Sequence, residues 1–243
     1  MYFTSQDIVG DITERHFRIG EIPGVLWTPT SAHADSPAPL ILLGHPGDLG
    51  RMHPRLVARA QRAAADGFAT ASIELPGGGD RQPLPEIERA RNDLHAALAV
   101  GGPIDEVVDR LVLPLVSQAV PEWQSALDGL LALPELRGPV GFSGGILAIA
   151  IRLARVEPRI EAAGFFAGSF VPRSMFEEAR QLTLPLHVLL QWDDSGNDRQ
   201  LALDLFDAFG SAEKTLHANM GGHTGVPEFA GDDAARFFKR HLG

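Results

Sequence analysis

The chain has 243 residues, of which 31 are acidic and 21 basic, so its net charge at neutral pH is −10. This charge argues against nucleic-acid or anionic-membrane partners, and the absence of cysteine excludes disulfides, thiolate zinc sites and a cysteine nucleophile. The first 17 residues lack the apolar core of a signal peptide, and no run approaches the ~18 apolar residues of a membrane span, so we expect a cytoplasmic protein.

The first third of the chain is predicted to alternate between strands and turns. Apolar and polar residues alternate over 16–28, which indicates two short strands that meet at Pro23-Gly24. Continuous apolar runs over 39–43 and 68–75 indicate two buried strands. A glycine-rich turn follows each run, and a helix at about 54–66 connects them.

The segment 83–121 departs from this alternation. Helical patterns cover 85–100 and 104–119, and the proline at 114 is expected to kink or split the second helix. A further helix is expected at 122–133. The apolar residues of the second pattern recur at helical spacing: Val107, Val108, Leu111, Val112, Leu115 and Val116. This stripe has two interpretations, the underside of a lid over an active site or a helix packed on the sheet, and we hold both.

The second half of the chain alternates regularly between strands and helices. Strands are predicted at 139–142, 160–166, 185–192 and 213–220, and helices at 146–156, 198–209 and 232–242, with a short helix or loop at 172–181. The whole chain therefore predicts one α/β domain over 1–243, with a mainly parallel central sheet, helices on both faces and a small helical insertion. Sites in such sheets lie at the carboxyl ends of the strands.

The stretch Gly141-Phe142-Ser143-Gly144-Gly145 joins a predicted strand to a predicted helix. The pattern G-x-S-x-G in this setting is typical of the nucleophile elbow of serine hydrolases. Small residues are needed two positions before and after the serine because the turn is tight. We therefore expect Ser143 to be a nucleophile and the Gly144 amide to help bind an oxyanion.

A serine nucleophile needs a histidine base and a carboxylate that orients it. His223 follows two glycines just after the last predicted strand, in a loop from which it can reach a serine at the sheet edge. His16, His33, His95, His187 and His241 lie in strand, helix, loop or terminal contexts and are interpreted as surface or packing histidines.

The acid is expected between the serine and the histidine in chain order. The strand that ends at Trp192 is followed by Asp193 and Asp194. Adjacent side chains point in different directions, so one aspartate reaches the histidine and the other caps a turn or helix. We favour Asp194 and keep Asp193 as the alternative.

These motifs together resemble the α/β-hydrolase superfamily, and within it the dienelactone hydrolase-like serine hydrolases. The resemblance covers essentially the whole chain and includes the turn Gly44-His45-Pro46-Gly47. The family often has G-x-x-D before its acid, and Gln191 replaces that glycine while the spacing still selects Asp194. Dienelactone hydrolase itself uses a cysteine, which this chain lacks.

The turn at Gly44 resembles the segment that supplies the second oxyanion donor in this superfamily. Proline has no N–H, so the Gly47 amide is the expected donor, and His45 is expected to brace the loop. Phe142, Trp192 and Phe166 neighbour the proposed site and predict a partly apolar pocket.

The predicted function is hydrolysis of a carboxylic ester, lactone or related acyl compound through Ser143, His223 and Asp194, with an acyl-enzyme. The same residues serve peptide cleavage, acyl transfer or carbon–carbon bond hydrolysis as alternatives, and a non-enzymatic binding protein of this fold is a third reading. We expect a small-molecule substrate, no cofactor and no metal, since no H-E-x-x-H or phosphate-binding motif occurs. The oligomeric state is left open.

Overall fold

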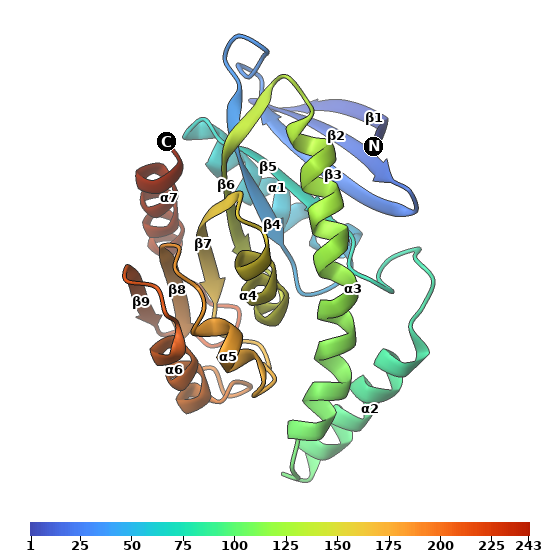
Figure 1. Ribbon diagram of the computed structural model, residues 1–243, viewed down its shortest axis with the longest axis vertical. Helices are drawn as coiled ribbons and strands as arrows, with labels where there is room; N and C mark the ends of the chain where they lie inside the picture. Colours follow the sequence, from blue (N-terminus) through green and yellow to red (C-terminus); the bar gives the residue numbers. More distant parts are fainter.

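The computed structural model describes residues 1–243 and contains one nine-stranded sheet in the order β1-β2-β3-β5-β4-β6-β7-β8-β9 (Figure 1). The strands are β1 (Tyr2–Val9), β2 (Ile12–Ile19), β3 (Ile22–Pro29), β4 (Ala38–Gly44), β5 (Ala69–Ile73), β6 (Leu136–Gly144), β7 (Ile160–Phe166), β8 (Leu186–Gln191) and β9 (Lys214–Asn219). From β5 to β9 all neighbouring strands are parallel, and β1, β2 and β3 join antiparallel. The predicted mainly parallel sheet is therefore confirmed.

Helices cover both faces of this sheet, as right-handed crossovers require. The helices are α1 (Leu49–Ala65), α2 (Pro85–Ala99), α3 (Asp105–Leu131), α4 (Leu147–Val156), α5 (Met175–Ala179), α6 (Arg199–Ala208) and α7 (Glu228–Leu242). The buried side chains of α1 and α7 pack with those of β3 and β4 in one apolar cluster. Those of α3, α4, α5 and α6 belong to a larger cluster on the opposite face.

The first strands differ from the prediction. The antiparallel turn lies at Gly20, whose φ is 56°, and Pro23-Gly24 lies inside β3. Gly24 is paired with Phe17, and a Cβ on Gly24 would come within 2.3 Å of the Phe17 ring. The glycine therefore marks a place where a ring crosses the neighbouring strand, not a turn. The strand β1 was not predicted, because its residues are almost all exposed and lack an apolar face.

The segment 83–121 forms a hairpin of two helices. Figure 1 shows that α2 and the first half of α3 extend past the edge of the sheet at which the parallel strands end. The helix α3 is continuous over 27 residues although it contains Pro114 and Pro121, so the predicted split at Pro114 and the separate helix at 122–133 are wrong. Apolar side chains are buried along its whole length, and their packing outweighs the backbone hydrogen bonds that the two prolines remove.

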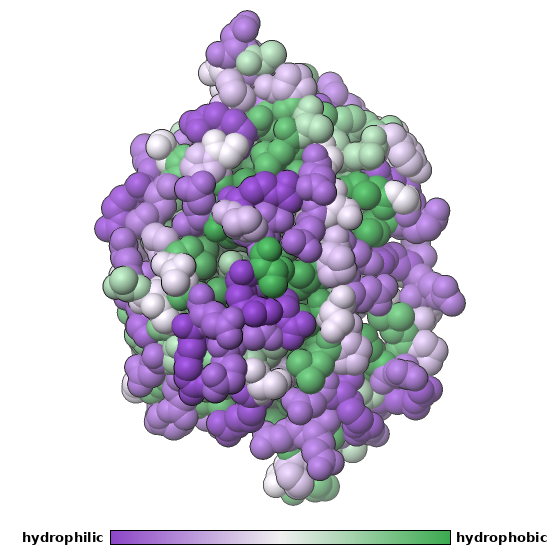
Figure 2. Space-filling view, viewed as in Figure 1, coloured by the Kyte–Doolittle hydropathy of each residue, from purple (hydrophilic) through white to green (hydrophobic).

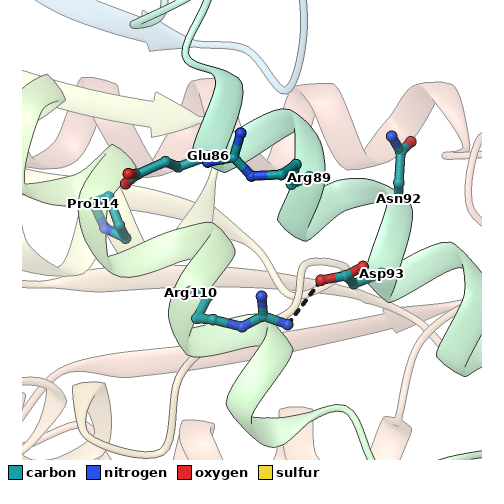
Figure 3. A pocket seen from close by; sticks show the side chains of 6 residues that line it. All are labelled: Glu86, Arg89, Asn92, Asp93, Arg110 and Pro114. Carbon is teal, nitrogen blue, oxygen red and sulfur yellow. Dashed lines mark hydrogen bonds and ion pairs between the residues drawn. The ribbon is translucent and has the colours of Figure 1, made fainter.

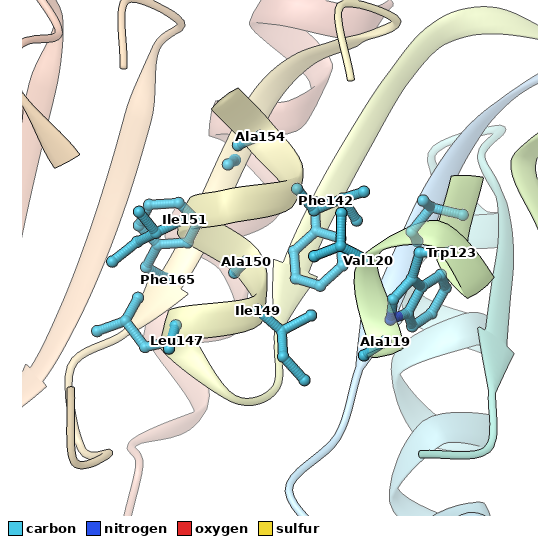
Figure 4. Close-up of a cluster of buried hydrophobic side chains, with 14 of the residues drawn as sticks. Ala119, Val120, Trp123, Phe142, Leu147, Ile149, Ala150, Ile151, Ala154 and Phe165 are labelled. Atoms are coloured by element: carbon cyan, nitrogen blue, oxygen red, sulfur yellow. The ribbon is translucent and has the colours of Figure 1, made fainter. Parts of the chain in front are cut away.

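The predicted apolar stripe of α3 faces α2 at one end and the body of the protein at the other. Val108, Val112 and Val116 lie in the same cluster as Ile87 and Leu94 of α2. The later residues of α3 pack on β6 and α4, as Figure 4 shows for Val120 and Trp123 beside Phe142. The rings of Trp123 and Phe142 meet edge to face, with centroids 5.7 Å apart.

The face of the molecule shown in Figure 2 is mostly hydrophilic, in keeping with the charge of the chain. On the face shown in Figure 2, hydrophobic residues form small separate patches between charged and polar ones. None of the helices combines the length with the apolar character that crossing a membrane requires.

Candidate active site

Ser143 lies near the end of β6, paired with Gly164 of β7. The sharp turn follows it: Gly144 and Gly145 have φ values of 79° and 80°, and the helix α4 begins at Leu147. The expected strand–turn–helix arrangement is present, but the left-handed residues are the two glycines, and the serine has ordinary strand geometry.

The glycines of this stretch are explained by close packing. A Cβ on Gly145 would come within 2.8 Å of the Gly44 backbone in the neighbouring strand β4. A Cβ on Gly141 would come within 2.7 Å of Leu242 and 2.9 Å of Phe238, both on α7. Side chains at either position would push the turn away from β4 or α7.

The Ser143 side chain is held by Arg59 of α1. The Arg59 Nη2 donates to Ser143 Oγ and to the Ser143 carbonyl, both at 2.9 Å, while Nη1 donates to the Gly44 carbonyl at 3.3 Å. The serine hydroxyl accepts in this contact, so its own proton remains available to a base. Ser143 and Arg59 line a cavity of about 110 Å³ between α1 and α7, together with apolar side chains that include Leu43, Phe68 and Phe238.

Arg59 was not singled out from the sequence. Removal from water lowers the pKa of its guanidinium to about 10, with the charge of Arg55 as a second cause. No carboxylate pairs with Arg59, so its bonds go to carbonyl groups and to Ser143. The signal in the sequence is its spacing, since Arg59 stands three residues after Leu56 and four before Ala63, on the apolar face of the helix.

His223 and Asp194 come together at the carboxyl edge of the sheet. The Nδ1 of His223 lies 2.7 Å from Asp194 Oδ2. The Asp194 side chain is 3% exposed and that of His223 is 55% exposed, so the carboxylate is shielded while the imidazole faces solvent. Asp194 Oδ1 accepts from the Gly196 amide at 3.0 Å. A buried carboxylate on Nδ1 fixes the tautomer that leaves Nε2 free to act as a base.

Asp193 has a different task. Its Oδ1 accepts from the amides of Gly221 and Gly222, both at 2.9 Å, so it holds the turn that precedes His223. These two bonds lower the pKa of Asp193. Gln191 holds the same turn from the other side, because its side-chain amide donates to the Gly222 carbonyl at 2.8 Å. Gln191, which replaces the family's usual glycine, thus positions the loop that carries His223. The sequence alone does not reveal this role.

Ser143 and His223 lie on the same side of the sheet but are not hydrogen-bonded. Phe166 follows Gly164, the partner of Ser143, by two residues, which corresponds to roughly 6.6 Å along the strand. The ring of Phe166 meets the His223 imidazole edge to face, with centroids 5.4 Å apart. The imidazole therefore lies beside the end of β7, near a residue two positions along that strand from the partner of Ser143.

The turn after β4 contains Gly47, whose amide was predicted to be the second oxyanion donor. His45 is buried, and its Nε2 donates to the Ile73 carbonyl at 2.9 Å, which ties the turn to β5. No backbone carbonyl accepts from the Gly47 amide. Asp48 caps the start of α1 by accepting from Arg51 N at 2.8 Å, so the helix begins at Leu49, five residues before the predicted start.

The three aromatic residues predicted to line the pocket lie in different surroundings. Phe166 contacts His223, and Trp192 is 41% exposed beside the aspartates, with Arg199 4.3 Å above its ring. Phe142 is 1% exposed and points into the core beside Trp123 (Figure 4). Because it directly precedes Ser143 in β6, the two side chains point to opposite faces of the sheet.

A larger groove lies away from these residues. It has a volume of about 570 Å³ and is lined only by polar side chains and a proline of α2 and α3, as Figure 3 shows: Glu86, Arg89, Asn92, Asp93, Arg110 and Pro114. Arg110 and Asp93 form an ion pair of 2.9 Å across it. No residue of the expected site lines this groove.

No protein-family profile matches the chain, and no curated protein matches its sequence. Solved structures do match. A cold-adapted esterase from an Arctic intertidal metagenomic library is 25% identical over 100% of both chains, with a TM-score of 0.77. Acetyl xylan esterase 1 from Thermoanaerobacterium sp. is 12% identical over 98% of this chain and 87% of that one, with a TM-score of 0.66. A dienelactone hydrolase from Anabaena variabilis is 19% identical over 96% of this chain and 100% of that one, with a TM-score of 0.62.

Proposed function

We propose that this chain, a hydrolase with the α/β-hydrolase fold that is similar to dienelactone hydrolase-like enzymes, is a serine hydrolase of carboxylic esters or lactones. The observation that carries this proposal is the bond of 2.7 Å between His223 and the buried Asp194 at the edge where the serine strand ends. The esterase from the Arctic library supports the choice of an ester as substrate.

In the proposed reaction Ser143 Oγ attacks the carbonyl carbon of the ester, and its proton passes to Nε2 of His223. Asp194 stabilises the imidazolium that results. The imidazolium then protonates the leaving alcohol, which departs and leaves an acyl group on Ser143. Water, deprotonated by His223, cleaves this acyl-enzyme and restores the serine.

The reaction requires Ser143 to meet His223, so we propose that substrate binding turns the Ser143 side chain from Arg59 toward the imidazole. The serine hydroxyl accepts from Arg59 and keeps its proton, and the guanidinium stabilises a developing alkoxide by its charge. Hydrogen bonds between catalytic groups are often long without substrate and shorten when it binds.

The oxyanion is proposed to bind the amides of Gly144 and Gly47. Each donor of this kind is worth roughly 10²–10³ in rate. The cavity beside Ser143 has a volume of about 110 Å³, which suits a small acyl group, and its lining combines apolar side chains such as Phe68 and Phe238 with the charged side chains of Arg59, Arg62 and Asp66. Peptide cleavage, acyl transfer and carbon–carbon bond hydrolysis stay as alternatives that use the same groups.

Labelling with a fluorophosphonate followed by peptide mass mapping tests the nucleophile. We expect one label, on Ser143, and no label on Ser143→Ala. We also expect this variant to hydrolyse short-chain p-nitrophenyl esters more slowly, by up to roughly 10⁶-fold. Ser169→Ala is the matched control, because Ser169 lies in the loop after β7 and is also partly buried. A label on another serine, or full activity of Ser143→Ala, overturns the proposal.

The acid is tested by comparing Asp194→Asn with Asp193→Asn. We expect the first to lower kcat by about 10⁴-fold because the amide favours the wrong tautomer of the histidine. The second keeps an oxygen that accepts from Gly221 and Gly222 and is expected to lower kcat much less. The reverse order assigns the acid to Asp193.

A further inference from the structure

Three potential metal ligands, none of which belongs to the proposed active site, converge on the α1 face of the sheet. Glu14 and His16 are two residues apart in β2, so their side chains point to the same face. His53 belongs to the second turn of α1, which covers that face. The ligand atoms of the three side chains all lie within 4.8 Å of one another.

The distances within this group fit a tetrahedral ion. His53 Nε2 lies 3.0 Å from each oxygen of Glu14, and His16 Nε2 lies 3.1 Å from Glu14 Oε1. Ligand atoms on a tetrahedral zinc with bonds of about 2.0–2.1 Å are separated by about 3.3–3.4 Å. A shift of a few tenths of an ångström therefore opens the group enough to hold the ion.

The carboxylate is unusual because it is buried without a permanent cation. The Glu14 side chain is 7% exposed, and its only ion-pair partners are His16 and His53. No arginine or lysine pairs with this carboxylate, and its hydrogen-bond partners are Trp27 and the two imidazoles. A bound cation would supply the positive charge that a buried carboxylate needs.

An outer contact fixes the carboxylate. Trp27 is paired with Glu14 across β2 and β3, and its Nε1 donates to Glu14 Oε2 at 2.5 Å. Donors that hold a metal ligand in place from behind are a regular part of metal sites. The imidazoles of His16 and His53 are stacked, with centroids 6.0 Å apart and planes 19° from parallel, and both direct Nε2 at the same carboxylate.

We propose that Glu14, His16 and His53 form a binding site for a divalent transition-metal ion, with zinc as the best match to two imidazoles and a carboxylate. The proton on Nε2 of each neutral imidazole moves to Nδ1 when Nε2 binds the ion. His16 and His53 are 42% and 33% exposed, so a water molecule reaches the fourth position. The bound ion links α1 to β2, directly after the turn that carries Gly47.

Zinc titration of the full chain, freed of metal with a chelator, tests this site. We expect one equivalent to bind by isothermal titration calorimetry and to remain by elemental analysis after gel filtration. His53→Gln and Glu14→Gln are expected to weaken binding by at least tenfold, and Trp27→Phe by about 10–100-fold. Zinc is expected to raise the melting temperature of the wild type but not of His53→Gln.

Two control variants locate the site. His95→Gln removes an exposed histidine of α2, and His217→Gln removes a half-buried histidine that contacts a different acid, Asp233. Both are expected to bind zinc as the wild type does. His53 is a partly exposed helix residue, so His53→Gln tests the proposal even if Glu14→Gln fails to fold. Absence of zinc binding by the wild type, or unchanged affinity in His53→Gln, overturns it.

Discussion

At the scale of single residues, the buried His187 makes stability depend on pH. Removal from water lowers its pKa to about 4, with a smaller effect from His217, whose ring lies 4.6 Å away. Between pH 6.5 and 4 the unfolded chain binds a proton at this histidine and the native chain does not, so stability falls as the pH falls. Over this range the free energy of unfolding is expected to fall by about 3 kcal/mol through His187.

The measurement is the free energy of unfolding in urea at pH 7.0 and pH 4.5. Between pH 7.0 and pH 4.5, we expect the free energy of unfolding of His187→Gln to fall by about 2–3 kcal/mol less than that of the wild type. His95→Gln, on the exposed face of α2, is expected to behave as the wild type. Equal losses in all three proteins contradict a neutral buried His187.

Gly141 supports a second prediction at this scale. A methyl group there meets Leu242 and Phe238 of α7 at under 3 Å, so Gly141→Ala is expected to cost about 1–3 kcal/mol through overpacking. Gly47→Ala places its methyl in open space at an ordinary φ and is expected to cost almost nothing. Urea unfolding of both variants checks this difference, and an equal cost rules out the steric explanation.

Residue identity alone predicted some of the site and not the rest. The pattern around Ser143 identified the expected nucleophile, and the chain order then selected Asp194 and His223. In the structure Asp194 and His223 are hydrogen-bonded to each other. The contact between Arg59 and Ser143 was beyond the sequence, because it depends on how α1 crosses the end of β6. The sequence analysis also did not identify the group of Glu14, His16 and His53, because these residues lie on two elements and match no spacing motif.

At the scale of elements, α3 shows how packing overrides a local signal. Pro114 predicts a break, yet the helix continues because residues on both sides of it are buried. The proline still removes the hydrogen bond to the Arg110 carbonyl. Pro114→Ala restores a donor at an exposed position and is expected to raise stability by about 1–3 kcal/mol.

Thermal and urea unfolding followed by circular dichroism measure this gain. Gln118→Ala, one turn further along the same exposed face, is the control and is expected to change stability by a few tenths of a kcal/mol. A lower midpoint for Pro114→Ala indicates that the proline is needed for the path of the helix.

The elements that the sequence predicted well are those with a continuous apolar run or a strong helical period. The strands β4, β6, β7 and β8 are buried in the sheet and were found to within a few residues. The strand β1 was missed because it lies at the sheet edge with nearly every side chain exposed. Its pairing with β2 depends on backbone bonds and register, which an exposed strand does not encode in its pattern.

At the scale of the whole molecule, the hairpin of α2 and α3 is joined to the body at one end only. The residues of α3 from Ala119 onward pack on α4 and β6, and Trp123 is buried against Phe142. The first half of α3 packs chiefly on α2, and α2 in turn packs chiefly on α3. The distal part therefore depends on a two-helix contact, whereas the proximal part shares the main core.

This asymmetry predicts two levels of local stability. Segments with fewer buried contacts to the rest of a protein open at lower free energy than the core. Native-state hydrogen exchange with mass spectrometry should show lower protection for α2 and residues 105–113 than for 119–131. The strand β6 is the internal reference for the fully protected core.

A variant within the hairpin separates local opening from general destabilisation. Leu94→Ala removes a buried side chain of α2 that packs on α3 and is expected to speed exchange in α2 and residues 105–113 while β6 keeps its protection. If the hairpin instead opens together with the sheet, the variant raises exchange in β6 by the same factor. That result makes the hairpin part of the core, and it then cannot act as a lid that moves independently over Ser143 and His223.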